Sequence, residues 1–576
     1  MRDVKLLPEA SPRGPTDLTS RLLPASIILL LAVFPPETHG AAMAGAAALI
    51  VLVVAVAWAR PVHPIGPRVL VVAILASTPL VLAAVAPGAA PEPLVAFILA
   101  GALGVHAACL SPTVRESDSV PWALAAAGVI VSFFAIHQTL WGLDATVAHV
   151  ETAVGVPDRD LVLSRLSSGR AFAMFATPAA LGGYLALALP VTVAIGLGRK
   201  GKARIALLSG ALVMAAGMLA TFSVTALAAL VGAVVLAGVA RRGRWRLTAA
   251  VGVVGLVLVL AVVGLRKDEI LDRSRWDSPW RLRAGNFRVA TEVIEDHPWI
   301  GVGPGGFGEV FPQYRREGDN ETRHVHDLPL EMMAELGIVP GSLAAILFLG
   351  LFLGPVLRRD DDSAGWVHGA RIGLAAFAIQ NLVDFTAFFP SILWTAALLR
   401  GLTVEPGFES TAPLTRGWRW TRGIVLAATV VAAALAALGG LSWEARYHAR
   451  QAAASGDAAK AGRLAEQSSR LAPWNIDAQS ILAQSLLERA GKAPDGAAAF
   501  REALGRSNRA VALSPVRAST REVRARIRIA LGDTPGAWAD LVGAARLYPL
   551  RTEYARLRDE IEPYVPRRPD LDEGAP

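Results

Sequence analysis

Apolar and polar residues alternate in long blocks between residues 22 and 442. A helix that crosses a bilayer needs about 20 consecutive, mostly apolar residues. Thirteen runs fit this pattern, although the first and the twelfth are short: 22–34, 41–59, 68–86, 93–110, 120–141, 172–197, 204–222, 223–240, 247–265, 336–357, 366–385, 388–403 and 423–442. The pattern therefore predicts an all-α, polytopic membrane protein with 12–13 spans and a large polar loop at residues 266–335.

The composition supports a membrane protein. The chain has 576 residues, of which 53% are hydrophobic, and a mean hydropathy of +0.44, which excludes an ordinary soluble globular protein. The net charge of +8 could suggest a nucleic-acid partner. We do not expect one, because the basic residues lie in short loops between the apolar runs. The single cysteine, Cys109, excludes a disulfide or a thiolate metal site within one chain.

The basic residues also predict the orientation of the chain. Short arginine-containing loops occur in alternate connections, near residues 60–68, 199–204, 241–246, 358–359 and 416–422. The positive-inside rule places these loops in the cytoplasm, together with an N-terminal tail at residues 1–21 that lacks a cleavable signal. The membrane domain then extends from residue 22 to residue 442. The loop at 266–335 and everything after residue 442 lie on the opposite face.

A second domain follows the last apolar run. Residues 443–565 are charged and alanine-rich, and three Leu-x-Pro triplets end at Pro473, Pro515 and Pro549, where each closes a predicted helix. The proline spacings are 42 and 34. A period of 34 resembles the tetratricopeptide repeat, with an insertion in the middle unit. Such repeats bind peptides or proteins, so we expect a protein partner here. Residues 566–576 are predicted to be a disordered tail.

A histidine motif ends the polar loop. His326 is followed by the pattern x8-Glu-Leu-Gly-x3-Gly, which places Glu335, Gly337 and Gly341 just before an apolar run. This spacing resembles the signature of the O-antigen ligase and polymerase family, which comprises bacterial membrane glycosyltransferases that use polyprenyl-diphosphate-linked sugars. The spacing selects His326 over the nearby His324. The resemblance implies a multi-pass protein of the bacterial inner membrane, with its active site and C-terminal repeats facing the periplasm.

Two arginine motifs resemble the same family. Residues 170–179 keep Arg170, Phe175 and Pro178 of the family pattern Arg-x-x-Gly-Thr-Phe-x-Asn-Pro-Asn. An anchor that reaches lipid headgroups is the alternative role for Arg170. In residues 281–307, Arg283 takes the family arginine position, and Arg281 is the competing assignment. A solvated basic face is the alternative there.

The segment that follows Arg283 is predicted to be helical. Residues 286–296 have an apolar face, which we expect to lie on the membrane surface and to direct Arg283 at the outer leaflet. The Gly-x-Gly-x-x-Gly run at 301–306 follows no predicted strand, so we interpret it as a tight turn and not as a dinucleotide site.

One position departs from the family pattern. Many members carry a Ser-Arg pair where the seventh and eighth spans meet, but this chain has Thr-Phe-Ser-Val-Thr at 221–225, with Val224 in the arginine position. If that arginine normally holds the diphosphate, Arg170 or Arg281 has to supply the charge here.

The resemblance implies a reaction that these residue types suit. A polyprenyl-diphosphate-linked glycan already carries its leaving group. Guanidinium groups of Arg283, Arg170 and Arg281 can bind the diphosphate, and His326 can deprotonate or orient an acceptor hydroxyl. We expect no metal, because outer-face histidines and carboxylates lack ligand spacing on one helix, and no other cofactor.

The sequence does not identify the acceptor molecule. It could be a lipid A core sugar of lipopolysaccharide, another glycan repeat unit in polysaccharide synthesis, or a protein serine or threonine. A transporter or flippase with a repeat scaffold is the alternative from another class. It predicts ionisable residues inside the spans, whereas Asp384 and His137 lie near span ends.

Overall fold

The computed structural model describes residues 15–58, 91–115, 117–152, 163, 166–240, 245–267, 279–358, 365–404, 416–491 and 496–565. These residues are mostly helical and include no strand, so the predicted all-α polytopic class is confirmed. The predicted span at 68–86 and the predicted tail at 566–576 lie outside the described residues.

Twelve helices in the described ranges follow the predicted apolar runs. They are α1 (Pro15–Val33), α2 (Gly40–Trp58), α4 (Pro91–Arg115), α5 (Ser119–His137), α8 (Pro178–Gly198), α9 (Gly201–Ala220), α10 (Val224–Ala240), α11 (Trp245–Leu265), α16 (Ile338–Leu353), α17 (Gly365–Gln380), α18 (Pro390–Leu402) and α19 (Arg416–Ala454). Six segments of the described chain are long and apolar enough to cross a membrane, and four further apolar helices are shorter. The number of spans stays a prediction.

Small residues bring several of these helices into backbone contact. A β-carbon added at Gly40 would lie 2.1 Å from the carbonyl oxygen of Gly440, which joins α2 to α19. One added at Gly401 would lie 2.2 Å from the carbonyl oxygen of Gly104, which joins α18 to α4. One added at Gly369 would lie 2.3 Å from the carbonyl oxygen of Pro190, between α17 and α8. Such contacts are typical of helix packing in membranes, where small residues permit close approach.

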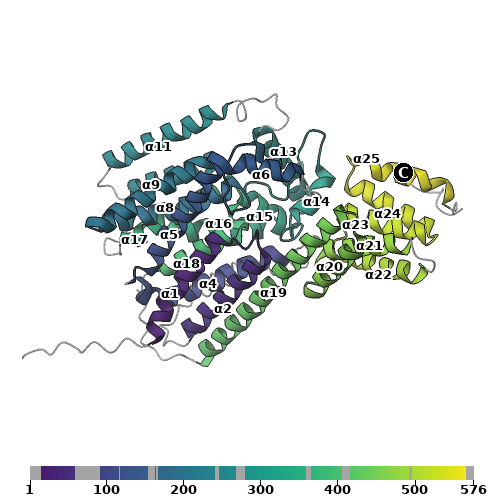
Figure 1. The fold of residues 1–576 in the computed structure, drawn as a ribbon, viewed down its shortest axis with the longest axis horizontal. Helices are drawn as coiled ribbons and strands as arrows, with labels where there is room; N and C mark the ends of the chain where they lie inside the picture. Colours follow the sequence, from purple (N-terminus) through teal and green to yellow (C-terminus); the bar gives the residue numbers. More distant parts are fainter. Residues whose placement is uncertain are drawn as a thin grey trace, which may run out of the picture.

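The predicted polar loop folds into a helical layer over one end of this bundle (Figure 1). It contains α13 (Pro279–Asp296), α14 (Phe307–Tyr314) and α15 (Leu328–Leu336), and these helices share a small core. Val289, Ala290 and Val293 of α13 are buried in that core with Phe307 and Phe311. The expectation that this face of α13 lies on the membrane surface is therefore wrong, because α14 and α15 already cover it.

The last predicted span does not stop at residue 442. It continues as the 39-residue helix α19 into the C-terminal region. There it is followed by α20 (Ala458–Leu471), α21 (Ile476–Ala490), α22 (Ala497–Leu513), α23 (Ala518–Ala530), α24 (Thr534–Leu547) and α25 (Thr552–Ile561). Helices α20, α22 and α24 each end two residues before one of the three predicted prolines. The predicted helix ends are thus confirmed, while membership of the tetratricopeptide class stays a prediction.

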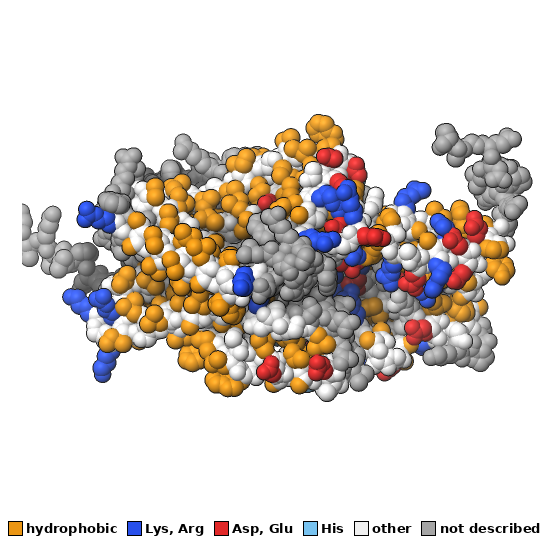
Figure 2. Space-filling model, turned by 90° about the horizontal axis from the view of Figure 1, so that it is seen from above, with side chains coloured by type: hydrophobic (Ala, Val, Ile, Leu, Met, Phe, Trp, Pro, Cys, Tyr) orange, Lys and Arg blue, Asp and Glu red, His pale blue; other side chains and the backbone are white. Residues whose placement is uncertain are grey.

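Charge and apolar surface separate along the molecule. Figure 2 shows hydrophobic side chains over most of the face that it presents, with charged side chains of both signs gathered toward the end that carries the C-terminal helices. A group of Lys and Arg side chains lies at the opposite end. This distribution fits a bundle whose sides face lipid and whose two ends face water.

Candidate functional site

His326 lies at the junction between the polar loop at residues 266–335 and the membrane helices. It precedes α15 in a non-helical segment and has a φ of +68°, an uncommon conformation for a residue other than glycine. Its Nδ1 atom is 3.7 Å from Oδ1 of Asp384, and its ring meets the ring of Phe385 edge-on at 4.5 Å. The distance to Asp384 is too long for a hydrogen bond but short enough for an ion pair. The carboxylate of Asp384 therefore lies next to the imidazole without a hydrogen bond between them.

Asp384 lies in the loop between α17 and α18, and its side chain is 4% exposed. Thr225 at the start of α10 donates its hydroxyl to Oδ2 at 3.0 Å, and the backbone N–H of Phe385 donates to Oδ1 at 3.0 Å. Burial raises the pKa of Asp384, but His326 and the charge of Arg283 outweigh burial and lower the pKa below its ordinary value. Asp384 is thus held as a carboxylate beside His326.

Backbone contacts fix the segment that carries His326. Asp327 caps α15 by accepting the N–H of Leu330 at 2.8 Å, and the N–H of Leu328 donates to the carbonyl oxygen of Asn381 at 2.9 Å. Asn381 in turn accepts the N–H of Ala387 at 2.8 Å through its own side chain. The 381–387 loop therefore holds both Asp384 and the start of α15, which sets the position of the histidine relative to the carboxylate.

His324 has a different environment. Its Nδ1 is 2.6 Å from Oε1 of Glu331, which is fully buried and also accepts the N–H of Val325 at 3.1 Å. Its ring stacks on Phe385, with ring centroids 4.4 Å apart. His324 thus has a carboxylate partner within hydrogen-bond distance, and the choice of His326 from the motif spacing stays a prediction.

The remaining motif residues pack the glycine-rich segment against α15. Glu335 is buried and accepts the N–H of Phe307 at 3.4 Å, while its carbonyl oxygen accepts the N–H of Gly303 at 2.9 Å. Burial and the nearby Glu331 raise the pKa of Glu335 well above its usual range. Gly301 has a φ of +70°, and a β-carbon there would lie 2.3 Å from the backbone of Glu335. The segment is a tight turn, as expected.

Arg170 lies in a loop ahead of α8. The apolar run at 172–197 placed it at the start of a helix, but α8 begins only at Pro178. Its Nε donates to the carbonyl oxygen of Thr221 at 3.0 Å. The loop is held by Gln138, whose side chain accepts the N–H groups of Phe172 and Ala173 at 2.9 and 2.8 Å. Gln138 begins a short π-helix at the end of α5, a feature that is frequent at functional sites. The loop therefore brings Arg170 to the turn between α9 and α10.

A second arginine reaches the same turn. Arg266, one residue beyond α11, donates from Nη1 to the carbonyl oxygen of Phe222 at 3.0 Å. Two guanidinium groups thus lie beside the turn where Val224 replaces the family arginine. Arg266 was not among the residues predicted from the sequence, although its place as the first basic residue after an apolar run is a signal that could have found it.

The two candidate arginines of α13 differ in their surroundings. Arg283 is half-buried, and its charge contributes to the lowered pKa of Asp384. Arg281 is exposed, and a β-carbon added at Gly318 would lie 2.8 Å from its Nη2. The charge of Arg283 thus acts on Asp384, while Arg281 lies next to the loop at 315–319.

The comparison with known families covers the same part of the chain. Residues 209–346, from α9 into α16, match a family model described as O-Antigen ligase. The match supports the O-antigen ligase family. It includes His326, Arg283 and Arg281, whereas Arg170 and Asp384 lie outside the matched segment. No curated protein and no solved structure matches the chain. The match and the apolar helices together indicate a multi-pass membrane protein related to ligases of the glycosyltransferase type.

Proposed function

We propose that this protein transfers a glycan from polyprenyl diphosphate to an acceptor hydroxyl at the periplasmic face of the bacterial inner membrane. The observation that supports this proposal is that His326 lies 3.7 Å from a buried carboxylate, Asp384, on which the charge of Arg283 also acts. A histidine ordinarily titrates near neutral pH, so it can accept a proton under physiological conditions. The neighbouring carboxylate then stabilises the imidazolium that forms.

The proposed step is a single displacement. Nδ1 of His326 faces Asp384, so Nε2 faces the substrates and takes the proton of the acceptor hydroxyl. The acceptor oxygen attacks the anomeric carbon of the donor sugar, and the bond from that carbon to the diphosphate oxygen breaks. The leaving group is polyprenyl diphosphate with its bonding electron pair. The products are the glycosylated acceptor and a protonated His326, which then loses its proton to water.

Arginines provide the charge that the leaving diphosphate requires. Guanidinium groups bind phosphate oxygens through paired hydrogen bonds and stay protonated. The charge of Arg283 acts on Asp384, while Arg170 and Arg266 flank the turn at Val224. We assign the diphosphate to these three residues, with Arg281 farther out as a secondary contact. This assignment needs no metal ion.

The proposal is tested with purified protein, a polyprenyl-diphosphate-linked oligosaccharide and three acceptors: lipid A core, a second donor molecule and a serine-containing peptide. The acceptor that becomes glycosylated separates a ligase from a polymerase and from a protein O-oligosaccharyltransferase. His326→Ala should abolish transfer, and His297→Ala is the matched control because His297 is an exposed histidine at the end of α13. Wild-type transfer by His326→Ala would show that another group is the base. Absence of transfer to all three acceptors by the wild-type protein would favour the transporter alternative.

A further inference from the structure

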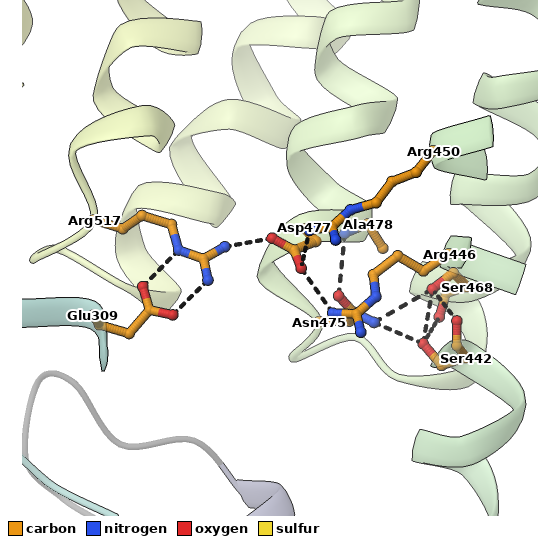
Figure 3. Close-up of polar contacts among 9 residues, drawn as sticks. All are labelled: Glu309, Ser442, Arg446, Arg450, Ser468, Asn475, Asp477, Ala478 and Arg517. Atoms are coloured by element: carbon orange, nitrogen blue, oxygen red, sulfur yellow. Dashed lines mark hydrogen bonds and ion pairs between the residues drawn. The ribbon is translucent and has the colours of Figure 1, made fainter. Parts of the chain in front are cut away.

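The C-terminal helices contact the polar loop at residues 266–335, called the outer loop below, through one bridging arginine. Arg517, just before α23, donates to both carboxylate oxygens of Glu309 in α14, at 2.6 and 2.5 Å. Its third contact is Oδ1 of Asp477 in α21, at 2.5 Å. Arg446 and Arg450 of α19 meet the other oxygen of Asp477 at 2.7 and 2.8 Å (Figure 3). One network of charges therefore runs from α19 through the C-terminal helices to the outer loop.

A tyrosine makes a second connection. The hydroxyl of Tyr548, at the end of α24, accepts from Nη1 of Arg315 at 2.7 Å and donates to Oε1 of Glu321 at 2.5 Å. Arg315 also donates twice to the carbonyl oxygen of Asp319, at 3.0 and 2.8 Å. Two separate contacts thus hold the outer loop and the C-terminal helices at a fixed separation.

A cavity of about 200 Å³ lies between these contacts. Glu309, Glu321 and Arg323 line it from the outer loop, and Ser519, Tyr548 and Arg551 line it from the C-terminal helices. Glu321, Arg323, Ser519 and Arg551 are exposed residues, so the cavity opens to solvent. Its walls carry carboxylates, guanidinium groups, a phenol and a hydroxyl.

We propose that this cavity binds one sugar residue of a saccharide acceptor. This inference rests on the proposed function, because it assigns the acceptor of that reaction to a glycan. The hydroxyl groups of a sugar ring both donate and accept hydrogen bonds. Glu321 can accept through Oε2, the guanidinium groups of Arg323 and Arg551 can donate, and the hydroxyl of Ser519 can do both.

Size and position favour an acceptor sugar over the lipid-linked donor. Pockets for drug-sized ligands have volumes of about 300–1,000 Å³, so this cavity suits a single ring with the rest of the chain leaving through its open side. Mostly polar walls do not suit a polyprenyl chain. Arg323 lies three residues before His326 in the same non-helical segment. A glycan held here can therefore continue along residues 323–326 to the reacting histidine.

The test measures binding apart from transfer. The probe is the core oligosaccharide of lipopolysaccharide, released by mild acid, and its binding to the full-length protein in nanodiscs is followed by saturation-transfer NMR. Ser519→Trp places a large side chain in the cavity and should weaken binding at least tenfold. Ala530→Trp is the matched control, since Ala530 is an exposed small residue at the other end of α23. Arg551→Ala, which removes a donor from the opposite wall, should also weaken binding.

The outcomes separate this inference from the proposed function. His326→Ala should bind the oligosaccharide as the wild-type protein does, because the histidine does not line the cavity. Saturable binding that is lost in Ser519→Trp and kept in Ala530→Trp supports the cavity, even if no transfer is detected. Three results would overturn the inference. The first is equal binding by both tryptophan variants, and the second is binding of a serine-containing peptide in place of the oligosaccharide. The third is the absence of saturable binding by a protein that transfers glycans.

Discussion

Replacing Asp384 by asparagine removes the charge beside His326 with little change of shape. The side-chain oxygen of asparagine can still accept the N–H of Phe385. Its amide can donate to the hydroxyl of Thr225, which then acts as an acceptor and no longer as a donor. The two backbone and side-chain contacts of this position are therefore kept. What is lost is the stabilisation of a protonated His326 during proton transfer.

The size of the loss follows from the geometry. Two unit charges about 4 Å apart attract each other by roughly 4 kcal/mol at an effective dielectric constant of about 20, and the pair here is separated by 3.7 Å. His326 is 29% exposed, so water screens part of this attraction. We therefore take about 2–3 kcal/mol as the effect on the barrier. This corresponds to a decrease in kcat of roughly 30- to 150-fold.

The assay is steady-state transfer from the lipid-linked donor, with kcat and KM determined separately. KM for the donor should change little, because Asp384 does not bind the diphosphate in the proposed mechanism. Asp327→Asn is the matched control, since this residue caps α15 and asparagine is an equally good cap. In His326→Ala the added Asp384→Asn change should have little further effect, because the two residues act as one unit. A kcat for Asp384→Asn within threefold of the wild-type value, or an equal loss in Asp327→Asn, would refute this reasoning.

Three other predictions follow from the same arrangement. Arg283→Lys should lose most transfer activity although the charge is kept, because lysine cannot form the paired contact with a diphosphate; Arg281→Lys should be milder, and equal tolerance in the transfer assay would indicate a merely basic surface. Deletion of residues 446–576 should leave detectable transfer but lower its yield, because Glu309 loses its C-terminal partner; full in vitro activity of the truncated protein would contradict this role. Alkaline phosphatase fused after Pro576 should be active, since it needs an oxidising compartment to form its disulfides; a fluorescent cytoplasmic reporter at that position would reverse the predicted orientation.

The membrane helices could be predicted from the sequence because each depends on a local property, namely a run of apolar residues. The helix ends in the C-terminal region were equally local, since α20, α22 and α24 each end two residues before Pro473, Pro515 or Pro549, and a proline disfavours continuation of a helix. The position of α13 could not be obtained in this way. Its apolar face is compatible with a lipid surface and with a protein partner, and only the fold of α14 and α15 decides between them.

The candidate site shows the same limit. The motif spacing selected His326 over His324, and this selection stays a prediction, because both imidazoles lie near a buried carboxylate. Asp384 was noted only as an ionisable residue near a span end, because its relation to His326 depends on how the loop at 381–387 packs against α15. Thr225 lies in α10, and Arg266 follows α11. Contacts between segments so far apart in the chain leave no periodic signal in a single sequence.

Because α19 runs without a break from the bundle into the C-terminal region, its position among the membrane helices also determines the orientation of the C-terminal helices. A helix of 39 residues is about 58 Å long and turns by about 100° per residue. Gly440 meets Gly40 inside the bundle, and two residues later Ser442 bonds to Ser468 of α20. The helix is continuous between these two contacts, so the rotation of α19 within the bundle determines the direction in which the C-terminal helices present Arg517. One residue inserted after Leu441 would swing the whole C-terminal region by more than a quarter of a revolution and carry Arg517 away from Glu309.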